Sequence, residues 1–259
     1  MKAFVKTTNG TFPNVNFYLA WQAFNSMGYS VQLFEEEDID TLDITRDTPV
    51  FAGVTTFRKI IESFGIYYPT FDCYPEVLKP YYKRNVYEST LGEVRNKFHV
   101  DHVPVFVKPI KTKEFNGVVL NSILNTIPLA NNSDDTPVYV SDVVNIVSEY
   151  RVYVQDSEIL GVKQYWGDWN IIPSKEFVDE VVKNYNPSPC AYGVDIGVTA
   201  SGESLVIESN DGCNLGNYGL DYMFYGEMIL ARWIEITTPT QKKLMGNPHC
   251  GWIKINTYE

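Results

Sequence analysis

Residues 192–219, YGVDIGVTASGESLVIESNDGCNLGNYG, decide how this chain folds. Apolar and polar residues alternate on both sides of the turn sequence ASGE, which is typical of two strands joined in a β-hairpin. If the hairpin is centred between residues 201 and 202, Asp195 lies opposite Glu208. Asn210 then lies on the same face, two residues farther along the strand.

The two carboxylates of this hairpin would repel each other, because opposite residues on antiparallel strands have Cβ atoms about 5 Å apart. A hard cation with oxygen ligands, most simply Mg²⁺, would remove the conflict, with Asp195, Glu208 and Asn210 as its ligands. Two other interpretations stay open: a solvated surface hairpin, or one carboxylate paired with a nearby Lys or Arg.

The composition excludes several classes of protein. The chain has 259 residues, is 44% hydrophobic and carries a net charge of −11, which indicates a soluble globular protein and makes nucleic acid an unexpected partner. It contains no apolar run of about 18 residues, so no membrane span is expected. The N-terminus lacks the apolar core of a signal peptide, and we expect a cytoplasmic protein. The four cysteines and three histidines show no zinc-ligand spacing.

The N-terminal part of the sequence predicts a small α/β unit. Its hydrophobic patterns indicate strands over residues 2–7, 29–34 and 50–53 and helices over 14–27 and 55–64. A segment rich in Pro and Tyr follows and marks a boundary. We therefore expect a first unit over residues 1–75 and a second domain over 76–259.

A lysine follows the apolar strand predicted near residue 105. Lys108 is suited to bind a phosphate as a point charge at the end of that strand. The polar segment 111–117 comes next, and its Asn116–Gly117 pair favours a tight hairpin turn. Backbone N–H groups at such a tip would cover a bound phosphate, although an exposed hairpin loop fits the segment equally well.

A second pair of like charges is predicted near residue 150. The segment EYRVYVQ at 149–155 alternates cleanly, and a three-residue turn after it puts Arg151 opposite Lys163. Two cations on one face are unfavourable unless an anion bridges them, so replacing either by Met should leave stability unchanged or raise it. A polyphosphate with its metal would satisfy both charge pairs if the two hairpins face each other.

Four segments, in this order, resemble the ATP-grasp superfamily, and most closely a phage and bacterial branch of it. They are VFVKP at 105–109, VSDV at 140–143, EYR at 149–151 and the ESNDG…LGNYG segment at 208–219. The resemblance covers about residues 76–235, and Asp142 stands where the family pattern has Glu. It implies an α/β (α+β) fold in which antiparallel sheets of two subdomains, 76–140 and 141–259, enclose the nucleotide. Residues 1–75 would form a pre-ATP-grasp unit.

The resemblance also implies a role for each matched residue. Arg151 and Lys163 would contact phosphates or a developing acyl phosphate as catalytic residues. Mg²⁺ would be held by Asp195, Glu208 and Asn210. ATP would be bound through a strand lysine, a lid loop and backbone groups of a hinge, namely Lys108, Lys113, Phe115, Asn116, Gly117, Ser141, Asp142 and Val143.

The activity implied by the resemblance is ligation. An ATP- and Mg-dependent ligase would join a carboxylate to an amine through an acyl phosphate, releasing ADP and phosphate. The substrates would be an amino acid, a peptide or a protein end, in the host cytoplasm if the protein is encoded by a phage. Two alternatives stay open: an ATP-binding regulatory or phage structural protein without turnover, and a kinase built on the same fold.

Overall fold

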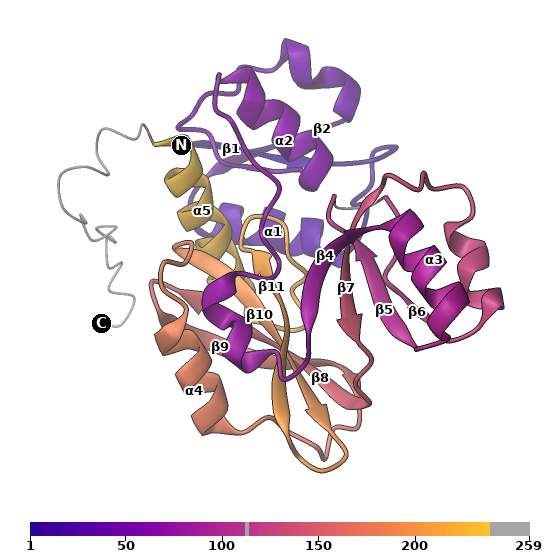
Figure 1. Cartoon of the computed structure of the whole chain (residues 1–259). Coiled ribbons are helices and arrows are strands. Elements are labelled where there is room, and N and C mark those ends of the chain that lie inside the picture. Colours follow the sequence, from indigo (N-terminus) through magenta and orange to yellow (C-terminus); the bar gives the residue numbers. More distant parts are fainter. Residues whose placement is uncertain (112–113, 239–259) are drawn as a thin grey trace.

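Three β-sheets organise the computed structural model, which describes residues 1–111 and 114–238 (Figure 1). Their strand orders are β2-β1-β3, β4-β7-β5-β6 and β11-β10-β8-β9. The first sheet is parallel and the other two are antiparallel. The mixed α/β class with antiparallel sheets that the sequence predicts is therefore confirmed. Lys113 and the C-terminal segment 239–259 lie outside the described residues.

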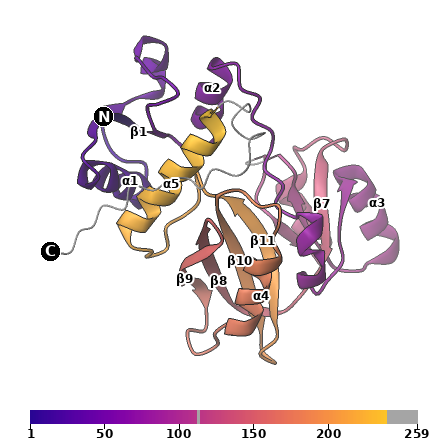
Figure 2. The ribbon, with the colours of Figure 1, turned by 90° about the vertical axis from the view of Figure 1, so that its left-hand side faces the viewer.

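In the N-terminal unit, β1 and β2 are joined by the helix α1 and β2 and β3 by the 3-10 helix η1, and these crossover connections explain its parallel sheet. Helix α5 from the far end of the domain completes its core by packing against α1, as Figure 2 shows. The predicted first unit therefore shares a core with a segment beyond residue 220. The elements are β1 (Lys2–Lys6), α1 (Val15–Ser26), β2 (Ser30–Phe34), η1 (Glu36–Thr41), β3 (Val50–Phe51), α2 (Val54–Ser63) and α5 (Tyr222–Thr237).

The second sheet is covered on one face by α3. This helix begins at Thr90, whose side chain accepts a hydrogen bond from the backbone of Glu93 while the Glu93 side chain caps Thr90 in return. Its apolar side packs against Val107 and Val140 of the sheet. The elements of this region are η2 (Glu76–Tyr81), β4 (Val86–Thr90), α3 (Leu91–Asp101), β5 (Val105–Pro109), β6 (Val118–Leu120), η3 (Ile123–Leu129) and β7 (Pro137–Asp142).

The third sheet has two different faces. Helix α4 packs its apolar side against one face, through Val178 and Val181 against Val152 and Ile196. The opposite face carries Arg151, and it is only partly covered by α5 and the N-terminal unit. The elements are β8 (Ile146–Gln155), β9 (Glu158–Gly167), α4 (Lys175–Asn184), β10 (Ala191–Thr199) and β11 (Ser204–Asp211). None of the helices in the described ranges has the length and apolar content needed to cross a bilayer.

Both predicted like-charge pairs are confirmed in register, and in each case an irregular step between the strands produces them. Asp195 lies opposite Glu208 while Ile196 lies opposite Val206, so Ile207 is an extra residue on β11. In the other hairpin, β8 and β9 are joined by a two-residue turn at 156–157 with positive φ at both positions, where three residues were predicted. A bulge beside Tyr153 restores the predicted register.

The tight turn predicted at Asn116–Gly117 is wrong. Such a turn needs positive φ at both residues, and neither is among the described residues with positive φ. Strand β6 begins directly after Gly117, so the turn residues lie earlier in the loop. Gly117 is needed for a different reason: a Cβ there would lie 2.5 Å from Cζ of Phe106. The pair therefore allows close packing of the loop against β5.

Candidate active site

Four charged residues form a continuous row across one face of the third sheet. Glu208, Asp195, Arg151 and Lys163 are direct cross-strand neighbours in that order, one on each strand. The two predicted hairpins therefore lie side by side in one sheet rather than facing each other across a ligand. The row reads two negative and then two positive charges, which brings an acidic and a basic residue together at its centre.

The centre of the row is a buried ion pair. Nε and an Nη of Arg151 donate to the two oxygens of Asp195, each at 2.7 Å, and the two side chains are only 7% and 4% exposed. Burial lowers the pKa of Arg151, but the Asp195 carboxylate outweighs burial and the net shift is upward. The guanidinium also lies over the rings of Tyr165 and Tyr218, at 5.9 and 4.9 Å from their centroids. Arg151 is thus held in one position.

A second ion pair connects the second and third sheets. Nζ of Lys108 on β5 donates a hydrogen bond to Glu208 on β11, and it lies 5.1 Å from the ring centroid of Tyr74. Burial lowers the pKa of Lys108, whereas Glu208 raises it, and the net shift is upward. The lysine predicted to bind phosphate and the carboxylate predicted to bind metal are therefore in direct contact.

A cavity of about 850 Å³ lies between the second and third sheets, α2 and the segment that follows α2. Arg151 and Lys163 are not among its lining residues, since Arg151 is covered by Asp195 and two tyrosine rings. Lys113 lies outside the described residues. The lining includes ten of the residues predicted for the nucleotide and the metal, namely Lys108, Phe115, Asn116, Gly117, Ser141, Asp142, Val143, Asp195, Glu208 and Asn210.

The predicted metal ligands offer the donor atoms that Mg²⁺ prefers. Two carboxylates and an amide supply only oxygen, and Mg²⁺ commonly takes one or two protein carboxylates while keeping several waters. The described residues hold no cluster of three or more His, Cys, Asp or Glu side chains suited to a metal. The set of Asp195, Glu208 and Asn210 falls below that number because it contains only two carboxylates. Asn210 donates to Asp195 at 3.2 Å, and Glu208 lies opposite Asp195 on the neighbouring strand. The donor types therefore fit Mg²⁺, and to bind it Asp195 and Glu208 would each exchange a contact with Arg151 or Lys108 for the metal.

Two features of the site were not predicted. Glu149, two residues before Arg151 on the same face of β8, lines the cavity, and burial raises its pKa. The alternation of the EYR segment was the available signal for it. Arg84, which lines the cavity, donates to the carbonyls of Val206 and Ile207 at 2.7 and 2.8 Å. It therefore stabilises the bulge that puts Glu208 opposite Asp195.

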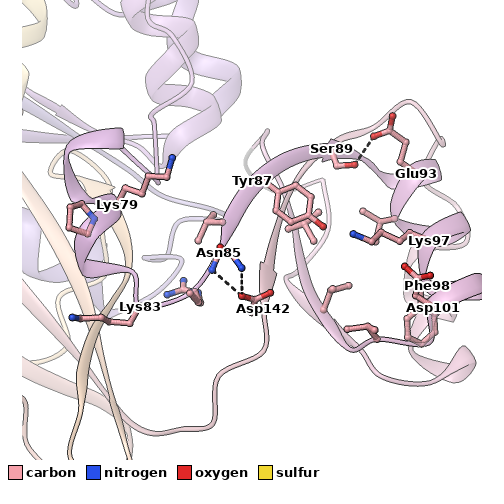
Figure 3. Close-up of a pocket in the computed structure, with 17 residues that line it drawn as sticks. Lys79, Lys83, Asn85, Tyr87, Ser89, Glu93, Lys97, Phe98, Asp101 and Asp142 are labelled. Atoms are coloured by element: carbon pink, nitrogen blue, oxygen red, sulfur yellow. Dashed lines mark hydrogen bonds between the residues drawn. The ribbon is translucent and has the colours of Figure 1, made fainter.

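A second concavity, of about 1260 Å³, lies around η2, β4 and α3 (Figure 3). Of the predicted site residues, only Asp142 lines it within the described part of the chain. The Asp142 carboxylate accepts hydrogen bonds from the backbone and side-chain nitrogens of Asn85, at 3.0 and 2.9 Å. The carboxylate is thus held by the start of β4, and a contact of Asp142 with adenine, as predicted, would come from its backbone.

Comparison with solved structures shows the same fold in several enzymes. A D-alanine–D-alanine ligase from Bacillus anthracis superposes with a TM-score of 0.58 at 14% identity, over 91% of this chain and 97% of that one. The D-cycloserine synthetase DcsG gives 0.58 at 12% identity, over 90% and 100%. A RimK domain ATP-grasp protein from Sphaerobacter thermophilus gives 0.55 at 14% identity, over 90% and 99%. Among curated proteins, no sequence matches this chain.

The sequence comparison identifies a family, whereas the solved structures show the fold alone. Residues 81–228, more than half of the chain, match the family described as ATP-grasp domain, R2K clade family 2. The matched region contains both antiparallel sheets, the Lys108–Glu208 contact and the charge row. The ATP-grasp resemblance seen in the sequence is thereby confirmed, and the chain belongs to the R2K clade of ATP-grasp domains.

Proposed function

We propose that the protein is an ATP- and Mg-dependent ligase that joins a carboxylate to an amine and releases ADP and phosphate. The observation that carries this proposal is the contact between Lys108 and Glu208, because the cation proposed to bind phosphate and the carboxylate proposed to bind the metal meet at one cavity. The cavity volume of about 850 Å³ is within the range of small-molecule and cofactor sites. ATP-grasp membership supports the nucleotide.

The proposed nucleotide contacts follow the two sides of the cavity. Lys108 would bind the α- or β-phosphate, and Phe115, Asn116 and Gly117 of the loop before β6 would cover the triphosphate together with Lys113. Backbone groups of Ser141, Asp142 and Val143, where β7 ends, would bind adenine. Asp195, Glu208 and Asn210 would hold Mg²⁺, which when bound would neutralise charge on the transferred phosphoryl group.

The proposed reaction has two displacement steps. A carboxylate oxygen of the first substrate attacks the γ-phosphorus, and the bond to ADP breaks. The amine then attacks the carbonyl carbon, phosphate leaves, and the amine loses a proton. Asp195 and Glu208 would hold Mg²⁺ near the γ-phosphate. Arg151 would hold Asp195 in the orientation seen here. Direct contact of Arg151 or Lys163 with a phosphate stays a prediction.

Calorimetry with ATP, with and without Mg²⁺, tests the first part of the proposal, and Lys175→Met is the control because Lys175 is an exposed lysine on α4 away from the cavity. ADP release is then measured across a panel of carboxylates and amines, and the products are identified by mass spectrometry. A new amide supports the ligase. A phosphorylated acceptor identifies a kinase instead, and ATP binding with no ADP release in any combination identifies a binding protein.

A further inference from the structure

Arg58 on α2 of the N-terminal unit brings a third cation to the cavity. Its Nε is buried without a hydrogen-bond partner, and the described residues provide it with no ion pair. More than nine in ten buried polar groups in proteins are hydrogen-bonded, because leaving one unsatisfied destabilises the folded state. An unsatisfied guanidinium nitrogen beside a cavity therefore indicates a ligand that supplies the missing acceptor.

Arg58 lies beside the ring of Tyr68, which is hydrogen-bonded to the strand that carries two of the proposed metal ligands. Its guanidinium lies 5.9 Å from the ring centroid of Tyr68. The Tyr68 hydroxyl donates to Asp211 at 2.7 Å, and Asp211 is held from the other side by Arg232 at 2.7 and 3.0 Å. Asp211 directly follows Asn210. The guanidinium therefore contacts, through the ring of Tyr68, the residue next to the proposed metal ligand Asn210.

The other described cations that line the cavity are already satisfied. Lys108 is paired with Glu208, and Arg84 donates to three backbone carbonyls, those of Tyr82, Val206 and Ile207. Of the described cavity cations, Arg58 is thus the one without a protein acceptor. A guanidinium presents parallel N–H groups that match the two oxygens of a carboxylate.

We infer that Arg58 binds a free carboxylate of the substrate, distinct from the carboxylate that is activated. This inference rests on the proposed ligase function and specifies its substrate class: an amino acid, or a short peptide with a free C-terminus. Lys108 on β5 and the loop before β6 come from the second sheet and are assigned to the triphosphate, whereas Arg58 enters from the N-terminal unit. The carboxylate of the amino acid or peptide that supplies the amine would satisfy Arg58 while its amino group faces the acyl phosphate at the proposed metal site.

Thermal melts in the presence of Mg²⁺ and the non-hydrolysable analogue AMP-PNP test this assignment. The probes are the free amino acids and dipeptides, each paired with its C-terminal amide. For wild-type protein we expect at least one free acid to raise the melting temperature beyond the AMP-PNP shift, with no effect of the matching amide. Arg58→Met should remove the response to the acid and keep the response to AMP-PNP. Arg58→Lys, which keeps the charge, should retain part of it.

The matched control is Lys59→Met, since Lys59 is the next residue on α2 and pairs with Glu36 outside the cavity. It should keep both responses. Where an acid is turned over, Arg58→Met should raise its KM roughly 10- to 100-fold, as expected for a lost charged hydrogen bond. Loss of the AMP-PNP shift in Arg58→Met would assign Arg58 to the nucleotide and overturn the inference. An undiminished response of Arg58→Met to the acid would also overturn the inference. The same holds if wild-type protein binds AMP-PNP but responds to no acid in the panel. A wild type that fails to bind AMP-PNP refutes the proposed function itself.

Discussion

The guanidinium of Arg151 forms two hydrogen bonds of 2.7 Å with the carboxylate of Asp195 on the neighbouring strand. Each residue also faces a like charge on its other side, Lys163 for Arg151 and Glu208 for Asp195. The central pair therefore relieves both repulsions without a ligand. Of the interpretations that the sequence left open, pairing of a carboxylate with a nearby Arg describes Asp195.

Replacing Arg151 by Met should destabilise the protein, which reverses the expectation drawn from the cation pair alone. The variant leaves Asp195 buried without its partner, and breaking a buried pair costs about 3–5 kcal/mol. Lys163→Met should change stability by only about 0.5 kcal/mol, because the described residues give Lys163 no ion pair. Urea unfolding of both variants measures the difference. Equal midpoints for Arg151→Met and wild type would contradict the role of the pair.

Asn210→Ala should reduce ligase turnover at least roughly 100-fold, because even outer partners of a metal site are worth 10- to 100-fold. The side chain lines the cavity and makes one hydrogen bond, to Asp195 at 3.2 Å, so the melting temperature should fall only slightly. ADP release and a thermal melt on the same preparation test both parts. Full turnover, or a variant that fails to fold, would contradict the metal-ligand assignment.

Lys108→Met should greatly reduce the rise in melting temperature caused by Mg·ATP. The lysine is the proposed phosphate ligand, and binding to the native state raises the midpoint by mass action. The free protein should also become less stable, since Glu208 loses its partner. Glu208→Gln added to Lys108→Met should restore part of that stability but no nucleotide response. The control Lys175→Met, which removes an exposed lysine on α4, should leave the ATP shift intact.

Gly117→Ala should weaken ATP binding without affecting the rest of the fold. The added Cβ would lie 2.5 Å from Cζ of Phe106, so either the ring or the loop before β6 must move. Phe106→Leu in the same chain shortens the opposing side chain and should restore part of the affinity. Calorimetric Kd values for wild type and the two variants provide the test. An unchanged Kd in Gly117→Ala would show that this loop does not close over the nucleotide.

Glu149 should make stability fall as the pH rises. Burial raises its pKa above the usual 4.5; the hydrogen bond with Tyr165 opposes that shift, and Asp195 and Glu208 reinforce it. The folded state thus holds this proton more tightly than the unfolded state. The contribution of Glu149 is therefore favourable below pH 4.5 and is lost as the pH rises through the raised pKa. Glu149→Gln should raise the melting temperature at pH 8 more than at pH 4. A gain confined to low pH would reverse the sign and refute the argument.

Local sequence determined the hairpins and the pairs within them. Alternation and turn residues predicted that Asp195 opposes Glu208 and that Arg151 opposes Lys163, and both pairs are present. The faces follow from local alternation, whereas the exact opposition of each pair also requires the irregular step in its hairpin. The bulge residue Ile207 was not predicted, since it depends on support from Arg84, more than a hundred residues away in the chain.

The tertiary structure alone decided which strands are neighbours. Placing β10 beside β8 made Asp195 the partner of Arg151, and closing the second sheet over the third made Glu208 the partner of Lys108. Alternation specifies the face on which a charge lies but carries no information about strand order or about contacts between sheets. Those depend on how the apolar faces of distant segments pack, and for this reason the sequence indicated the charged residues while only the fold showed which of them neutralise one another.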